Sequence, residues 1–191
     1  YCYDSPDPTR WQKLSKDLDI IVKPWNFNNG KNILICCQRD GGWSMDGEGV
    51  VNWLMKTISE LRKYTDRPVV IRFHPGDKRV AGHIKQIAGY RIPKVSWSTK
   101  MEIREDFAEA HAVINFNSSP AVASVIEGVP IIVEDPKSSQ VEEVCHTDLS
   151  QMGNLKPFDR EGWIRKIAQC HWSFADLRSG VAWQWMKKYL K

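Results

Sequence analysis

The sequence predicts an α/β fold: a single Rossmann-like parallel sheet with flanking helices, followed by two C-terminal helices. Two observations lead to this prediction. Between residues 32 and 133, short continuous apolar runs alternate with segments whose apolar residues recur at helical spacing. This alternation is typical of βαβ units, in which right-handed crossovers place the strands in parallel. A chain of 191 residues that is 42% hydrophobic can also bury one core without disulfides.

The composition excludes several other classes of protein. Charged residues of both signs make up 26% of the chain, which excludes a disordered or collagen-like chain. No apolar run approaches the roughly 20 residues that cross a bilayer, and the N-terminus has no signal-peptide pattern. The five cysteines lack metal-ligand spacing and are expected to be buried thiols in a reducing compartment. We therefore expect a cytoplasmic protein with no metal site.

The elements follow from the order of apolar patterns. Residues 1–30, which are rich in turn residues, are expected to form an extended arm with at most one short strand at 20–22. Residues 31–191 are expected to form one domain. The predicted strands are 33–37, 68–73, 95–97, 112–116 and 129–133. The predicted helices are 48–63, 80–88, 101–110, 120–127, 159–173 and 176–190. Ser119 and Pro120 suit the start of the fourth helix, and Gly128 suits its end.

Polar loops follow the predicted strands, and ligands of open parallel sheets bind at the carboxyl ends of the strands. The first loop contains the candidate binding residues Gln38, Arg39, Gly41 and Gly42. Glycines between a strand and a helix let backbone amides approach a phosphate. The spacing matches neither a dinucleotide fingerprint nor a P-loop, so an ordinary tight turn is an equally good interpretation.

The second loop carries the sharper pattern. Arg72 and His74 occupy alternate positions at the end of a buried strand, so they share one face. An anion would satisfy both side chains, and His74 could hold or carry a proton. Gly76, Asp77 and Lys78 complete the candidate loop. In the alternative interpretation, His74 bonds a backbone carbonyl and Arg72 pairs with an internal acid such as Asp77.

Two further loops add polar groups at the same predicted edge. Asn117, Ser118 and Ser119 combine amide and hydroxyl groups with a helix start, which predicts anion binding. Simple capping, for which Ser119 alone suffices, is the alternative. Asp135 follows the last strand and joins the candidate binding set.

Candidate catalytic groups are few. His74, Asp40 and Asp46 are the candidates for acid–base work, although aspartates in loops often serve only as turn residues. The remaining histidines stand alone and are interpreted as structural. These are His83, His111, His146 and His171.

These motifs resemble the donor-binding, C-terminal half of GT-B glycosyltransferases, and within them the capsule polysaccharide and glycerophosphotransferase-like groups. The run Arg72-Phe73-His74-Pro75 matches the Arg-x-His-Pro turn of those groups. Residues 117–119 and 128–130 match the two ends of their Asn-Ser…Gly-x-Pro stretch, and the likeness covers residues 32–140. The resemblance implies a nucleotide-sugar as donor substrate, held through its diphosphate by Arg72, His74 and the helix start at Ser119. It implies no tightly bound cofactor.

The sequence departs from that family in two places. The acidic residue that often holds the donor ribose is replaced by Ala123, and Glu127 lies one turn later. The chain also has room for only one of the two GT-B halves. The general base that activates the acceptor is therefore either missing or supplied from elsewhere. The possible sources are the arm, Asp40 or Asp46, and another subunit.

The resulting hypothesis is a glycosyltransferase that moves a sugar to a hydroxyl acceptor. Net charge +4 and nine tryptophans also suit a nucleic-acid acceptor, such as a hydroxymethylated base in phage-type DNA. One alternative is a non-catalytic nucleotide-binding module or subunit, and another is a polyol-phosphate transferase. The expected protein partner is a second copy, contacted through the helix bearing Trp183 and Trp185, or a missing N-terminal half.

Overall fold

The computed structural model describes residues 7–27, 30–41, 43–45 and 47–188. The chain forms two compact units. Residues 22–158 form the sheet unit, and the two chain ends, up to residue 21 and from residue 159, form the terminal unit. This division differs from the expected boundary between residues 30 and 31.

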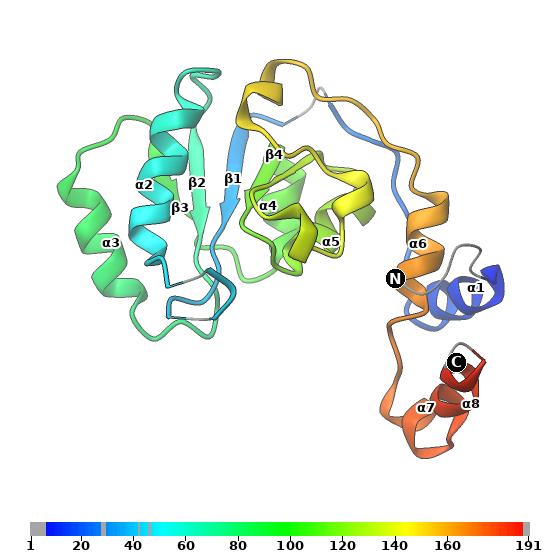
Figure 1. Ribbon diagram of the computed structural model, residues 1–191. Helices are drawn as coiled ribbons and strands as arrows, with labels where there is room; N and C mark the ends of the chain where they lie inside the picture. The colour runs from blue at the N-terminus through cyan, green and yellow to red at the C-terminus, as the bar shows by residue number, and fades with distance from the viewer. Residues whose placement is uncertain (1–6, 28–29, 42, 46, 189–191) are drawn as a thin grey trace. The chain divides into compact units, whose positions relative to one another are not determined.

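The sheet unit contains five parallel strands in the order β3-β2-β1-β4-β5. This order confirms the predicted Rossmann-like α/β fold (Figure 1). The strands are β1 (Asn32–Cys36), β2 (Val69–Arg72), β3 (Val95–Trp97), β4 (Ala110–Asn115) and β5 (Ile131–Val133). The chain order reverses direction between β1 and β4, which is the switch point where such sheets bind ligands.

Helices connect the strands at the predicted places. They are α2 (Val50–Leu61), α3 (Val80–Gly89), α4 (Ile103–Glu109) and α5 (Pro120–Ile126). Short 3-10 helices lie at Trp43–Met45, Pro136–Ser138, Glu142–Val144 and Leu149–Gly153. Helices α4 and α5 are shorter than predicted, because β4 begins directly after Glu109 and a left-handed Gly128 (φ +78°) follows α5.

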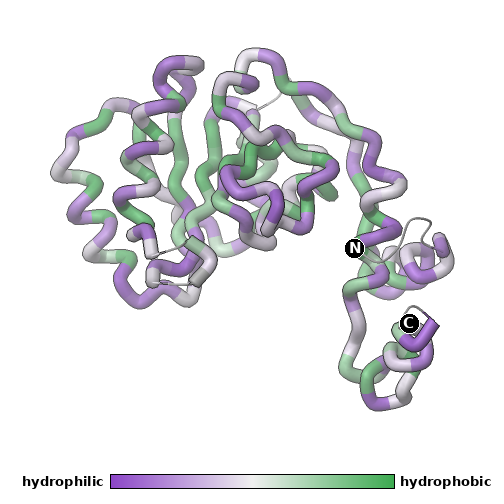
Figure 2. The backbone as a smooth tube through the Cα atoms, in the orientation of Figure 1, coloured by the Kyte–Doolittle hydropathy of each residue, from purple (hydrophilic) through white to green (hydrophobic). Residues whose placement is uncertain are grey.

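The core lies between the sheet and α2. Alternate residues of β1 and β2, including Ile33 and Ile71, pack with Trp53, Leu54 and Ile58 of α2. Each is at most 1% exposed, and burial of such a side chain contributes about 1.5–3 kcal/mol. The strands are hydrophobic along most of their length (Figure 2), as expected for strands covered on both faces.

The terminal unit is helical. It contains α1 (Pro8–Asp17), α6 (Glu161–Ala168), α7 (Phe174–Arg178) and α8 (Val181–Lys187). Its centre is Arg10, which is 7% exposed, lies 4.0 Å from the ring centroid of Trp172 and donates to the carboxylate of Asp176 at 3.1 Å. This arginine joins α1 to the C-terminal helices.

Two predictions about the chain ends are wrong. The arm is not extended throughout but contains α1, which Asp7 caps by accepting from the Thr9 N–H at 2.8 Å. Residues 20–22 form no strand, which the expectation of at most one strand allows. The helix predicted at 176–190 is interrupted by Gly180, whose φ of +77° ends one helix and starts the next. In α8, Trp183 is half exposed, whereas Trp185 packs against Trp172 with ring centroids 5.9 Å apart.

None of the helices in the described part of the chain has the length and apolar character to span a bilayer.

Candidate functional site

The parallel strands bring the predicted loops to one edge of the sheet, which we call the carboxyl edge. Residues after β1, β2 and β4 line two adjoining cavities there. The two cavities share the segment 72–75 and Met101. Of the four predicted loops, two contribute to these cavities, through His74 and Pro75 and through Ser118 and Ser119, whereas no described residue of 38–46 or of 134–140 lines either of them.

The larger cavity, which we call the serine cavity, has a volume of about 340 Å³. Its polar side chains include Ser118, Ser119, His74 and Glu102. The remaining lining is mostly apolar and comes from Cys36, Cys37, Phe73, Pro75, Met101, Ile103 and Pro120, together with Arg72. A mainly apolar wall with a few polar groups is the usual composition of a small-molecule site.

The smaller cavity, which we call the tryptophan cavity, has a volume of about 300 Å³. Trp97, at the end of β3, lines it and is 38% exposed. Val80 and Ile84 of α3 contribute apolar surface, and Lys100, whose amino group pairs with Glu109 at 3.4 Å, also lines this cavity. A partly exposed aromatic ring beside apolar side chains suits a flat ligand.

Arg72 holds the wall between the two cavities. Its guanidinium donates to the Asp106 carboxylate at 2.6 Å and to the Met101 and Lys100 carbonyls at 2.9 and 3.1 Å. Ser98 also donates to Asp106 at 2.7 Å. The guanidinium that was expected to hold a diphosphate is thus largely engaged by the protein, and its acid partner is Asp106, not Asp77. An ion pair this close to a cavity fixes the loop that forms the wall.

His74 lies exposed between the cavities. Its Nδ1 accepts from the Gly76 N–H at 3.0 Å, and its own carbonyl accepts from the Asp77 N–H at 2.9 Å. The ring therefore accepts a backbone hydrogen bond, instead of donating one to a carbonyl as the alternative interpretation had it. In the neutral ring this places the proton on Nε2, which can donate to a ligand.

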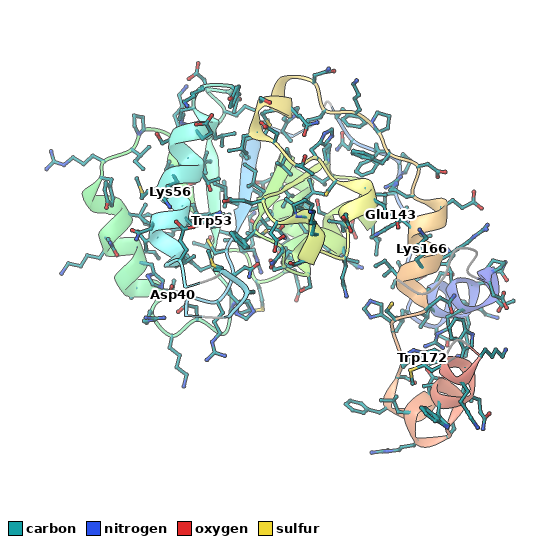
Figure 3. The ribbon with its side chains drawn as sticks, viewed as in Figure 1. Asp40, Trp53, Lys56, Glu143, Lys166 and Trp172 are labelled. Atoms are coloured by element: carbon teal, nitrogen blue, oxygen red, sulfur yellow. The ribbon has the colours of Figure 1, made fainter. Side chains whose placement is uncertain are left out.

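Asp40 and Asp77 form a partly buried polar cluster beside the cavities. Asp40, which is labelled in Figure 3, accepts from the Val50 N–H at 3.0 Å at the start of α2. It also pairs with Arg79 at 2.7 Å. Asp77 contacts His83 Nε2 at 3.2 Å and accepts from the Arg79 N–H at 2.8 Å. Partial burial opposes ionisation of Asp77, but hydrogen bonds from the Arg79 and Asp40 N–H groups and the nearby His83 hold its pKa below the ordinary value. Neither aspartate lines a cavity wall, so this geometry favours a structural role over base catalysis.

A second set of hydrogen bonds joins the loop after β1 to the loops after β4 and β5. The Asn117 N–H donates to Gln38 Oε1 at 3.1 Å, and the Asn117 amide donates to Asp135 at 3.0 Å. Hydrogen bonds from Ser138 and then Asn117 lower the pKa of Asp135. These three candidate binding residues are brought together, but outside the two cavities.

The other candidates are distributed around this edge. Gly41 has φ +72°, which explains a glycine there, and Arg39 and Lys78 are exposed. Gly42 and Asp46 lie outside the described residues.

Ser119 precedes α5, yet its side chain makes no capping bond, so the predicted cap is wrong. Because α5 has only seven residues, the predicted contribution of its N-terminus to anion binding is small.

Sequence reasoning missed Glu102 and Trp97. Glu102 is the N-cap of α4, where it forms a capping box with Glu105. The available signal in the sequence was an acidic residue, Glu102, followed three residues later by Glu105. Because α4 follows β3, the Glu102 carboxylate lies at the carboxyl edge. Glu127, by contrast, pairs with Lys23 and with Arg104 at 3.1 Å at the opposite end of α5. It does not replace the missing acid at Ala123.

Two further observations concern nucleophiles and metal ligands. Cys36 and Cys37 line the serine cavity but are 2% and 3% exposed, and burial raises the pKa of Cys36 to about 12. These thiols act as apolar surface, not as nucleophiles. Among the described residues, no three His, Cys, Asp or Glu side chains are grouped so as to hold a metal ion.

Comparison with known proteins finds similar chains among solved structures. A scan of family profiles and a search of curated proteins both return no match. Among solved structures, the chain is similar to the UDP-GlcNAc 2-epimerase of Methanocaldococcus jannaschii, solved in complex with UDP-GlcNAc and UDP. The identity is 14%, the TM-score is 0.44, and the match covers 74% of this chain and 45% of the epimerase. The chain thus matches less than half the length of that protein.

Proposed function

We propose that the chain binds a nucleotide-sugar at the carboxyl edge and transfers its sugar to a hydroxyl acceptor. The observation that carries this proposal is the pair of adjoining cavities that share the segment 72–75. Together they offer a mainly apolar wall, an aromatic ring, two hydroxyls and an imidazole, which matches a ligand with a base, a diphosphate and a sugar.

The two cavities suit different parts of such a ligand. The tryptophan cavity offers the ring surface of Trp97 for a base. The serine cavity offers the hydroxyls of Ser118 and Ser119. His74 lines both cavities, so its Nε2–H is placed to donate to a phosphate oxygen.

Transfer breaks the bond between the anomeric carbon and the phosphate oxygen. The electron pair remains on that oxygen, the acceptor oxygen forms the new bond, and the acceptor loses its proton. Donation from His74 would stabilise the charge that develops on the leaving diphosphate. Asp46 remains the proposed proton acceptor, because Asp40 is engaged with α2 and Arg79.

A thermal-shift panel tests donor binding. UDP, GDP, CDP, CMP and several nucleotide-sugars are added to the native chain and to His74→Ala, with His171→Ala as the matched control on an exposed residue of the terminal unit. A ligand that binds only the native state raises the melting temperature. We expect a shift for one nucleotide class, lost in His74→Ala and kept in His171→Ala. No shift with any nucleotide would contradict the proposal.

A transfer assay separates the remaining functions. We propose a hydroxymethylated DNA base as one acceptor, and the assay compares DNA bearing such a base with unmodified DNA. Donor binding without transfer or hydrolysis would instead indicate a nucleotide-binding module or subunit. Transfer from a CDP-alcohol would indicate a polyol-phosphate transferase. Sedimentation with and without nucleotide tests whether a second copy, or a second half added in trans, completes the site.

A further inference from the structure

The charge balance of the serine cavity is the starting observation. Its cation, Arg72, is paired with Asp106 at 2.6 Å, and His74 is the other titratable basic side chain that lines it. Glu102 contributes a carboxylate that has no basic partner among the described ion pairs. A carboxylate without a compensating cation disfavours phosphate in its immediate neighbourhood. This part of the cavity therefore suits an uncharged hydrogen-bond donor.

The position of Glu102 is fixed by its local structure. As N-cap of α4 it accepts from the Glu105 backbone, and the Glu105 side chain accepts from the Glu102 N–H at 3.4 Å. This capping box uses part of the acceptor capacity of the carboxylate. A carboxylate has about four acceptor sites on two oxygens, so it retains sites for a ligand while its direction is held.

The neighbours of Glu102 point to the chemical class of that ligand. Ser118 and Ser119 line the same cavity and can each donate and accept a hydrogen bond. Phe73, Pro75 and Pro120 provide apolar surface in the same wall. Acceptors and hydroxyls beside apolar surface match a sugar ring, which has hydroxyls on its rim and C–H groups on its faces.

We propose that Glu102 is a specificity-determining residue that accepts hydrogen bonds from a vicinal diol of a pentose or hexose ring bound in the serine cavity. The inference rests on the proposed function, because it names the part of the nucleotide-sugar that this cavity recognises. Two adjacent O–H groups donating to one carboxylate form short, charge-assisted hydrogen bonds, each stronger than a neutral one.

Calorimetric titration of the full chain tests this assignment. The ligands are UDP, GDP and CDP, each with its 2′-deoxy counterpart, and the matching nucleotide-sugars. The variant Glu102→Gln keeps the size and the capping oxygen. Glu105→Gln is the matched control, because it removes the same charge from the same capping box and lies outside both cavities. Melting curves of both variants verify that they fold.

The two sources of the diol give different results. For a ribose diol, Glu102→Gln removes a preference of about tenfold for the ribonucleotide over its 2′-deoxy form. For a diol of the transferred sugar, it removes a similar preference for the nucleotide-sugar over the nucleotide. In both cases Glu105→Gln keeps the native preference. Unchanged preferences in Glu102→Gln, or equal losses in both variants, would overturn the inference.

Failure of the proposed function is recognised separately. If no nucleotide binds the native chain, the proposed function fails. The role of Glu102 is then tested by titrating the native chain and both variants with free ribose and hexoses at high concentration. Binding that is lost in Glu102→Gln but kept in Glu105→Gln supports the diol site. Absence of sugar binding to the native chain overturns it.

Discussion

The two edges of the same parallel sheet are built in opposite ways. At the amino edge, backbone packs directly on backbone: a Cβ at Gly30 would lie 2.0 Å from the Ala110 carbonyl carbon, and one at Gly128 would lie 2.1 Å from the Pro24 oxygen. Arg62 covers carbonyls there, including that of Arg67 at 2.7 Å. The carboxyl edge instead contains two cavities. The closed edge stabilises the fold, and the open edge is left for a ligand.

The first prediction tests the closed edge and has the largest expected effect. Gly128→Ala places a side chain against the Pro24 carbonyl at a φ of +78°. We expect the free energy of unfolding to fall by about 3 kcal/mol or more, measured by urea denaturation. Gly47→Ala is the matched control at the carboxyl edge, because Gly47 has φ +82° and nothing within 4 Å of the added Cβ. Its cost should be about 1 kcal/mol. Equal costs would refute the contrast between the edges.

The second prediction concerns the wall between the cavities. Arg72→Met leaves the Asp106 carboxylate, which is 5% exposed, without its cation. We expect a loss of about 2–3 kcal/mol in the free energy of unfolding. Lys100→Met is the control, since Lys100 pairs with the exposed Glu109 at 3.4 Å and should cost about 0.5 kcal/mol or less. A neutral effect of Arg72→Met would mean that the guanidinium is free for a ligand, as the sequence first suggested.

The case of Arg72 illustrates how far the sequence can be interpreted. Apolar runs and turn residues predict the five strands. The runs of β1, β4 and β5 are almost wholly buried, whereas β2 alternates and β3 is largely exposed. They do not predict which acid neutralises Arg72, because Asp106 is 34 residues away on another element. The N-terminal helix was missed because prolines were interpreted as breakers, although Asp7 followed by Pro8 is a good helix start. Glu102 was missed because a glutamate before a helix usually lies on a solvated surface.

The third prediction asks whether Asp40 is structural or catalytic. Asp40→Ala removes the acceptor for the Val50 N–H at the start of α2. We expect a loss of about 1–2 kcal/mol in the free energy of unfolding, as for other lost caps. The control is Asp66→Ala, on an exposed residue, with a change within about 0.5 kcal/mol. Undiminished stability of Asp40→Ala together with lost transfer activity would restore Asp40 as a candidate base.

The fourth prediction is a pH dependence from Asp77. Its folded pKa lies below the ordinary value of 3.8, so the ionised form is stabilised in the folded state. The contribution is fully present above that ordinary value and is lost as the pH falls through the folded pKa. The difference in the free energy of unfolding between native and Asp77→Asn, about 1 kcal/mol at neutral pH, should therefore shrink below pH 3.8. A difference that stays constant to lower pH would show that the carboxylate gains nothing from its partners.

The central claim is that a nucleotide-sugar binds at the carboxyl edge. The most direct measurement is an NMR titration of the isotope-labelled chain with the nucleotide that gives the largest thermal shift. The account predicts that the backbone amide signals of Gly76, Glu102, Ser118 and Ser119 move together along one binding curve, while those of Gly30 and Gly128 stay fixed. Shifts confined to the amino edge or to the terminal unit, or signals that do not move at saturating nucleotide, would contradict it.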